Sequence, residues 1–193
     1  MFQVRFHGRG GQGVVTAAEL LAEAAFIEDR HAQAFPSFGS ERMGAPVMSF
    51  CRIDDKPIRT HEPVTEPDAL IIQDPTLLHQ ADLFAGLRRD GYILVNSARG
   101  FDDLGLEEFV AGFRHDRLLV VPAYALAMTH LGRPLPGAPM LGGFAALAGV
   151  VGLDSVLAAI GGKFPGPVAD ANAAAARAAF DYVADERKAL SHA

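Results

Sequence analysis

The sequence contains a single cysteine, Cys51, among its 193 residues. One thiol excludes an internal disulfide, and it also excludes an iron–sulfur cluster held by cysteines of this chain, because such a cluster normally takes four thiolates. Long runs of lysine or arginine are equally missing, and the formal charge is −6. We therefore expect neither nucleic acid nor a membrane surface as a partner, because both are bound through clustered positive charge.

Targeting and membrane-spanning patterns are also missing. The amino terminus alternates between apolar and polar residues over 2–6, without the basic, apolar and small-residue order of a signal peptide. The longest apolar stretch, from Met140 to Ala158, is broken by glycines and contains Asp154, which is typical of core helices rather than of a bilayer span. We expect a soluble, cytoplasmic protein.

The histidines and serines form none of the familiar catalytic patterns. Seven histidines show no H-x-x-x-H spacing, and no serine lies in a G-x-S-x-G segment. We predict no metal site on this chain, and a hydrolase has little support.

Short apolar runs alternate with helical patterns along the chain, which predicts an α/β fold. The expected architecture has three layers, with a mostly parallel, Rossmann-like sheet flanked by helices, and it forms one domain over residues 1–193. Prolines and glycines between residues 32 and 60 predict loops with short strands. Strands are expected at 2–6, 47–53, 70–73, 92–95 and 118–121, and helices at 14–26, 141–151, 153–160 and 168–190.

A glycine-rich motif follows the first predicted strand and precedes the first predicted helix. It consists of Gly8, Arg9, Gly10, Gly11, Gln12 and Gly13. Backbone N–H groups and the helix dipole can face an anion at such a turn, although the glycines equally allow a tight turn and close helix packing alone. A dinucleotide site also needs an acidic residue after the second strand, and residues 31–38 contain none. This argues against NAD.

The stretch from Phe35 to Pro46 is a second candidate. It combines rigid and permissive residues with aromatic groups, and it includes Ser37, Glu41 and Arg42. Such a segment either presents a defined surface to a ligand or partner or is an ordinary solvated loop.

Polar residues follow three of the predicted strands. Asp74, Asn96 and Ser97, with the turn over residues 122–124, would meet beyond the carboxyl ends of the strands, where ligands gather in sheets of this kind. These residues are candidates for lining one cleft. Asp74 is equally suited to cap a helix, and Asn96 with Ser97 to form a turn.

Over most of its length, the sequence resembles the gamma subunit, or the equivalent domain of fused forms, of the pyruvate:ferredoxin oxidoreductase (2-oxoacid:acceptor oxidoreductase) family. The matching segments are residues 8–18, 35–47, 52–59, 66–68, 73–78 and 139–143. The resemblance implies a complex that uses thiamine diphosphate with Mg²⁺ to decarboxylate a 2-oxoacid, pyruvate being the closest match. Electrons then pass through 4Fe-4S clusters to ferredoxin or another acceptor, and the acyl group passes to coenzyme A. The 2-oxoisovalerate, indolepyruvate and phenylglyoxylate enzymes share this subunit type.

The same resemblance implies a hetero-oligomer in which alpha, beta and delta (ferredoxin-like) sister subunits carry the cofactors. This chain is then inactive alone, contributes no assigned catalytic residue, and helps to form the coenzyme A entrance. On physical grounds, a helix start with free N–H groups at residues 10–13, assisted by Arg9, is suited to a phosphate of coenzyme A. Two remoter interpretations stay open: a nicotinamide-dependent dehydrogenase, and a non-catalytic, Rossmann-like interaction domain.

Overall fold

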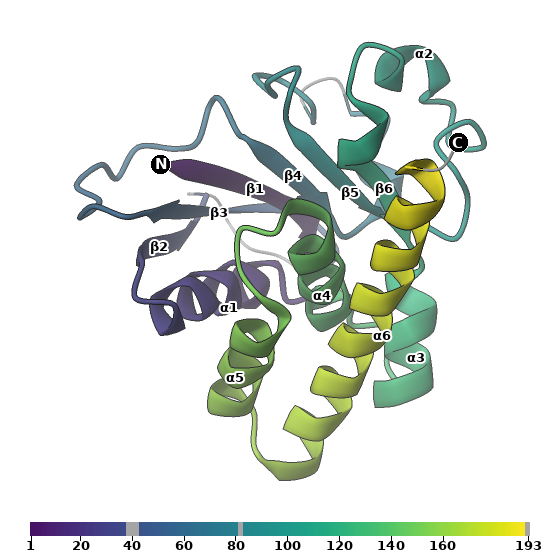
Figure 1. Ribbon diagram of the computed structural model, residues 1–193. Helices are drawn as coiled ribbons and strands as arrows, with labels where there is room; N and C mark the ends of the chain where they lie inside the picture. Colours follow the sequence, from purple (N-terminus) through teal and green to yellow (C-terminus); the bar gives the residue numbers. More distant parts are fainter. Residues whose placement is uncertain (38–42, 81–82, 192–193) are drawn as a thin grey trace.

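The computed structural model describes residues 1–37, 43–80 and 83–191, and its centre is a six-stranded sheet (Figure 1). The strand order is β2-β3-β1-β4-β5-β6. Three neighbouring pairs are parallel, whereas β3 runs antiparallel to both of its neighbours. The predicted α/β fold with a mostly parallel sheet is therefore confirmed. The strands are β1 (Phe2–Arg9), β2 (His31–Pro36), β3 (Pro46–Asp54), β4 (Ala69–Ile72), β5 (Tyr92–Asn96) and β6 (Leu118–Val121).

The long helices lie together beneath the sheet in Figure 1, and the short α2 lies above it. All four predicted helices are present, with ends shifted by a few residues. The expected turn over residues 122–124 is wrong, because it opens a further helix, α3. The helices are α1 (Val14–Ile27), α2 (Glu107–Val110), α3 (Ala123–Leu131), α4 (Gly137–Ala148), α5 (Leu153–Lys163) and α6 (Gly166–Ser191), with two 3₁₀ turns, η1 (Pro75–Leu77) and η2 (His115–Arg117).

Strand residues alternate between the two faces of the sheet. Phe6, Ile71 and Leu94 point to the long helices and belong to the larger core, in which they are fully buried. Leu70 and Ile72 point the other way, into a second cluster of buried residues. Because successive side chains point to opposite faces, this alternation determines which polar residues at the strand ends face the helices.

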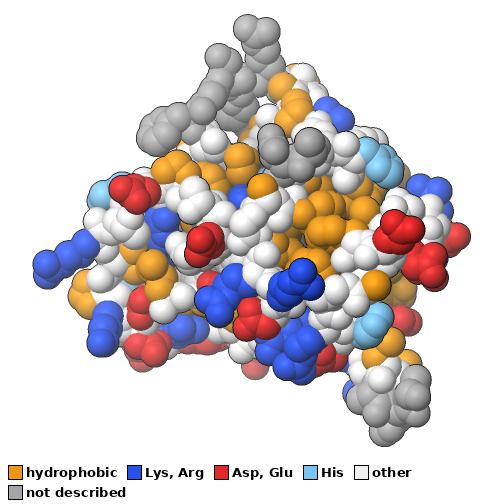
Figure 2. All heavy atoms as spheres, turned by 90° about the horizontal axis from the view of Figure 1, so that it is seen from above, with side chains coloured by type: hydrophobic (Ala, Val, Ile, Leu, Met, Phe, Trp, Pro, Cys, Tyr) orange, Lys and Arg blue, Asp and Glu red, His pale blue; other side chains and the backbone are white. Residues whose placement is uncertain are grey.

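The second face of the sheet is covered by loops and short helices. Three partly buried rings stack there, with centroid distances of 4.2 Å between Phe84 and Phe109 and 5.0 Å between Phe109 and Phe113. Figure 2, which views the molecule from above Figure 1, shows hydrophobic side chains gathered on this side. The three layers are thus long helices, sheet, and a thinner covering of loops.

Helices α4 and α6 pack closely because glycine leaves room for a backbone at their crossing. A side chain on Gly142 would collide with the carbonyl oxygen of Ala176.

None of the helices in residues 1–37, 43–80 and 83–191 combines the length and hydrophobicity needed to cross a bilayer.

Candidate functional site

The turn between β1 and α1 depends on its glycines. Gly11 and Gly13 have φ values of 92° and 70°, in the left-handed region where a side chain is strained. Gly8 allows close packing, because a Cβ there would lie 2.6 Å from Cγ2 of Val14. Gly13 precedes α1 as its N-cap, and no side chain accepts from the N–H groups of the first helical turn.

Part of the same turn is already hydrogen-bonded to the chain itself. The N–H of Gly10 donates to the carbonyl of Ala45 (2.9 Å), and the N–H of Gln12 donates to the carbonyl of Arg9 (3.1 Å). The expectation of free N–H groups throughout residues 10–13 is therefore wrong at Gly10 and Gln12. Further on, the start of α1 receives no hydrogen bond from a capping side chain.

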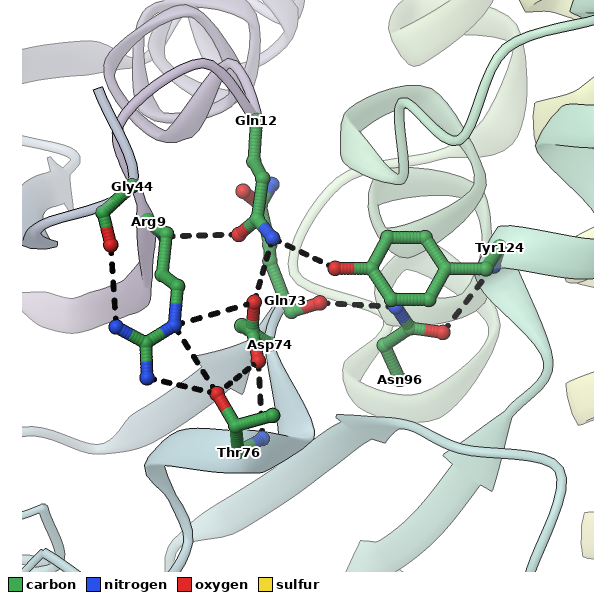
Figure 3. Close-up of polar contacts among 8 residues, drawn as sticks. All are labelled: Arg9, Gln12, Gly44, Gln73, Asp74, Thr76, Asn96 and Tyr124. Atoms are coloured by element: carbon green, nitrogen blue, oxygen red, sulfur yellow. Dashed lines mark hydrogen bonds and ion pairs between the residues drawn. The ribbon is translucent and has the colours of Figure 1, made fainter.

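Gln12 joins the turn to two other elements (Figure 3). Its Oε1 accepts the N–H of Arg9 at 2.7 Å, which leaves its amide nitrogen to donate elsewhere. Nε2 donates to Oδ2 of Asp74 and to the hydroxyl of Tyr124, both at 2.6 Å. One side chain thus links β1, the end of β4 and the start of α3.

Asn96 ties the ends of β4 and β5 to α3 in the same way. Its Nδ2 donates to the carbonyl of Gln73 (2.8 Å), and its Oδ1 accepts the N–H of Tyr124 (3.2 Å). These contacts bring Asp74, Asn96 and the 122–124 segment together at one edge, as predicted, but they do not include Ser97.

Asp74 is both the cap of η1 and an acceptor within this network. Its Oδ1 accepts the N–H of Thr76 at 2.9 Å and the hydroxyl of the same residue at 2.6 Å. Burial alone would raise the pKa of Asp74, but the hydrogen bonds from Thr76 and Gln12 and the charge of Arg9 outweigh it, so the pKa is lowered. The carboxylate is therefore ionised at neutral pH.

The guanidinium of Arg9 is engaged by the chain's own acceptors. Nε and Nη2 donate to Oγ1 of Thr76 at 3.0 and 2.8 Å, and Nη1 donates to the carbonyl of Gly44 at 3.1 Å. Nε also lies 3.6 Å from Oδ2 of Asp74. The sequence did not single out Thr76 as a site residue, although its place two residues after a capping aspartate is a signal for it.

Tyr124 keeps its proton. Burial, and then the negative charge of Asp74, raise the pKa of Tyr124 to about 12. Its phenol therefore stays a neutral hydrogen-bonding group that accepts from Gln12.

A pocket of about 630 Å³ opens beside the same turn, where the starts of α1 and α4, the end of α3 and the α5–α6 junction meet. Like α1, α4 begins without a side-chain cap. Apolar side chains dominate the walls, and two basic residues, His130 and Arg133, contribute to them. The pocket therefore pairs a mostly apolar interior with groups suited to a negative charge.

The remaining predicted residues lie elsewhere. Ser37 follows β2, which is two strands from β1, and its N–H donates to the carbonyl of Met48 on β3. Within the described part of the chain, Ser37 takes no part in the network. Ser97 closes a local turn through Arg99, with both hydrogen bonds at 2.9 Å. Glu41 and Arg42 fall outside the described residues.

Metal-ligating residues do not gather in the described parts of the chain. Within residues 1–37, 43–80 and 83–191, no group of three or more His, Cys, Asp or Glu side chains is placed to hold a metal ion.

The strand order also differs from that of a dinucleotide-binding fold. In such a fold the second strand lies beside the first, whereas here β3 separates β2 from β1. The end of β2 is thus displaced from the glycine turn.

Known proteins match the chain over nearly its full length. The family model described as pyruvate ferredoxin/flavodoxin oxidoreductase matches residues 3–182. Pyruvate synthase subunit PorC of Methanothermobacter marburgensis is 45% identical over 181 residues, which cover 94% of this chain and 97% of that protein. The common gamma subunit of the pyruvate/ketoisovalerate oxidoreductases of Pyrococcus abyssi is 46% identical, with 94% and 96% covered. The crystal structure of pyruvate oxidoreductase subunit PORC of Thermotoga maritima has a TM-score of 0.78 at 36% identity, and the match covers 93% of this chain and 95% of that one.

Proposed function

Because the chain belongs to the pyruvate ferredoxin/flavodoxin oxidoreductase family as a gamma-type subunit, we propose that its complex oxidatively decarboxylates pyruvate and transfers the acyl group to coenzyme A. The observation that carries this proposal is the full-length similarity to subunits of pyruvate synthase. The gamma subunit of Pyrococcus abyssi is named for pyruvate and ketoisovalerate enzymes alike. The 2-oxoisovalerate enzyme is therefore the alternative.

The proposal places the redox cofactors on other polypeptides. The one thiol of this chain, Cys51, is wholly buried, so its residues do not fit an iron–sulfur cluster. The described residues also lack a cluster of acidic side chains for the Mg²⁺ that accompanies thiamine diphosphate. We expect alpha, beta and delta sister subunits to supply thiamine diphosphate and 4Fe-4S clusters, and ferredoxin to receive the electrons.

The contribution proposed for this chain is a contact with a phosphate of coenzyme A. An uncapped start of α1 supports it, because open N–H groups and the helix dipole attract an anion. Arg9 supports it less than the sequence suggested, since its guanidinium already donates to Thr76 and Gly44.

The test is purification of the native complex, followed by assays with pyruvate, 2-oxoisovalerate, indolepyruvate and phenylglyoxylate in the presence of coenzyme A and a dye acceptor. We expect co-purifying subunits that carry thiamine diphosphate and clusters, and the highest kcat/KM for pyruvate. A preference for another 2-oxoacid would reassign the substrate. An isolated chain that binds NAD(H) in a fluorescence titration, or that turns over alone, would overturn the proposal.

A further inference from the structure

Strand β2 is one edge of the sheet, and one side of its backbone has no partner strand. The strand order ends at β2, which Figure 1 shows at the margin of the sheet with α1 beneath it. The N–H of Ser37 donates to the carbonyl of Met48, so the register with β3 makes residues 31, 33, 35 and 37 the ones that bond to β3. The N–H groups of Ala32 and Ala34 therefore point outward, and in the described part of the chain neither has a hydrogen-bond partner.

This edge has few of the features that keep edge strands from pairing. Natural edges are usually short, bulged or charged, or they carry proline. Residues 32–36 include no charged side chain, and β2 follows β3 over six residues in one unbroken register. Its proline, Pro36, stands only at the end. The opposite edge, β6, has four residues.

Exposed apolar side chains lie on the helix that packs beneath this edge. Phe26 and Ile27, at the end of α1, are 73% and 45% exposed. An uncharged edge with apolar side chains on its supporting helix is a surface that a strand of another molecule can cover.

The outward backbone groups of β2 are complementary to themselves. In an antiparallel pair with a second copy, Ala34 can lie opposite the Ala34 of that copy, and Ala32 then lies opposite Pro36. The two Ala34 residues exchange N–H to carbonyl hydrogen bonds, and the N–H of each Ala32 donates to the carbonyl of the opposite Pro36. The missing N–H of Pro36 leaves only the carbonyl of Ala32 without a partner in each copy.

A shift of this register by two residues is less favourable. It would bring Pro36 opposite Arg30, whose N–H already donates to the carbonyl of Ala25 at 3.1 Å. The paired strands would also overlap over fewer residues. The register centred on Ala34 is therefore the one that the edge favours.

The side chains agree with this pairing. Ala32 and Ala34 pack against the helix-side core, so only small residues and Pro36 would meet on that face. On the other face, each Gln33 would lie opposite the Phe35 of the second copy. Because residues 32–36 carry no charge, no like charges meet across the pair.

We propose that β2 pairs antiparallel with β2 of a second copy of this chain, centred on Ala34, and joins two six-stranded sheets into one. The assembled complex then contains two copies of this subunit in direct contact. The proposal does not depend on which 2-oxoacid the complex uses.

The experiment is a cross-linking test of the register in the assembled complex. Ala34→Cys places two thiols opposite each other, where Cα atoms are about 5.5 Å apart, a separation that a disulfide spans. Cys51→Ala is combined with it, because Cys51 lies opposite Ala34 on β3 and would compete. Diamide takes up the two electrons that leave the thiols.

Ala32→Cys in the same Cys51→Ala background is the matched control. Its side chain lies on the same face of the same strand, but the register places the two copies of residue 32 about 13 Å apart along the strands. We expect Ala34→Cys to give a disulfide-linked pair of this chain on a non-reducing gel, and Ala32→Cys to leave it unlinked.

A third variant tests the hydrogen bonds themselves. Ala32→Pro, added to Ala34→Cys, removes the other outward N–H and no bond to β3, and proline is tolerated on an edge strand. We expect the cross-linking rate to fall by about tenfold or more, because two hydrogen bonds across the pair are lost. The subunit content and thermal midpoint of the complex should stay as in Ala34→Cys alone.

Three results would overturn the proposal. The first is an Ala34→Cys complex in which this chain stays unlinked or is linked to a sister subunit. The second is equal cross-linking of Ala32→Cys, which would show contact without this register. The third is an unchanged cross-linking rate after Ala32→Pro.

Discussion

The charge on Asp74 should matter for stability, and Asp74→Asn tests it without changing the size of the side chain. The amide can still accept from Thr76 through one atom, but its NH₂ then faces the donating Nε2 of Gln12. A buried hydrogen bond to a charged group contributes about 1.5–3 kcal/mol. The pair with Arg9 adds at most about 0.5 kcal/mol, because its atoms are 3.6 Å apart and the arginine side chain is 31% exposed. We expect a loss of about 2–3 kcal/mol.

Urea unfolding of the purified chain, followed by circular dichroism, measures this loss at pH 7 and at lower pH. Since folding lowers the pKa of Asp74, its contribution is complete above the unfolded pKa of about 3.9 and disappears as pH falls through the folded pKa. Asp74→Asn should therefore converge on wild type in acid. The control is Asp55→Asn, whose carboxylate pairs with Arg30 at the surface and is 84% exposed. Equal stability of the Asp74 and Asp55 variants at pH 7 would refute the reasoning.

Three further outcomes can be checked by the same unfolding assay. Burial, with a nearby arginine, lowers the pKa of His7 from 6.5 to about 3, so wild type should lose up to about 1.4 kcal/mol per pH unit below 6.5, and His7→Gln should lack that slope. Gly142→Ala should cost about 3 kcal/mol or more, because its methyl group meets a backbone carbonyl of α6, whereas Gly161→Ala should be neutral or stabilising by up to about 1 kcal/mol. A small effect of Gly142→Ala would mean that α4 and α6 can move apart. Tyr124→Phe should cost about 1 kcal/mol by leaving one hydrogen of Gln12 without its acceptor, and an unchanged midpoint would argue that water replaces the phenol.

Patterns of neighbouring residues predict much of the secondary structure. The apolar runs that became β1, β4, β5 and β6 and the stripe that became α1 are properties of neighbouring residues, so the sequence predicts them well. Asp74 and Asn96 met at one edge because the carboxyl ends of parallel strands must do so. The capping role of Asp74 followed from Pro75 after it.

By itself, the sequence determined the α/β class, the glycine turn and the family, because these depend on residue types in order along the chain. Tertiary structure alone decided that β3 separates β1 from β2, that Arg9 donates to Thr76, 67 residues away, and that the side-chain amide of Gln73 is buried without a hydrogen-bond partner. The physical reason is that tertiary packing brings together hydrogen-bond partners that lie far apart in the sequence. A pattern of neighbouring residues therefore does not show which buried donors and acceptors remain without a partner.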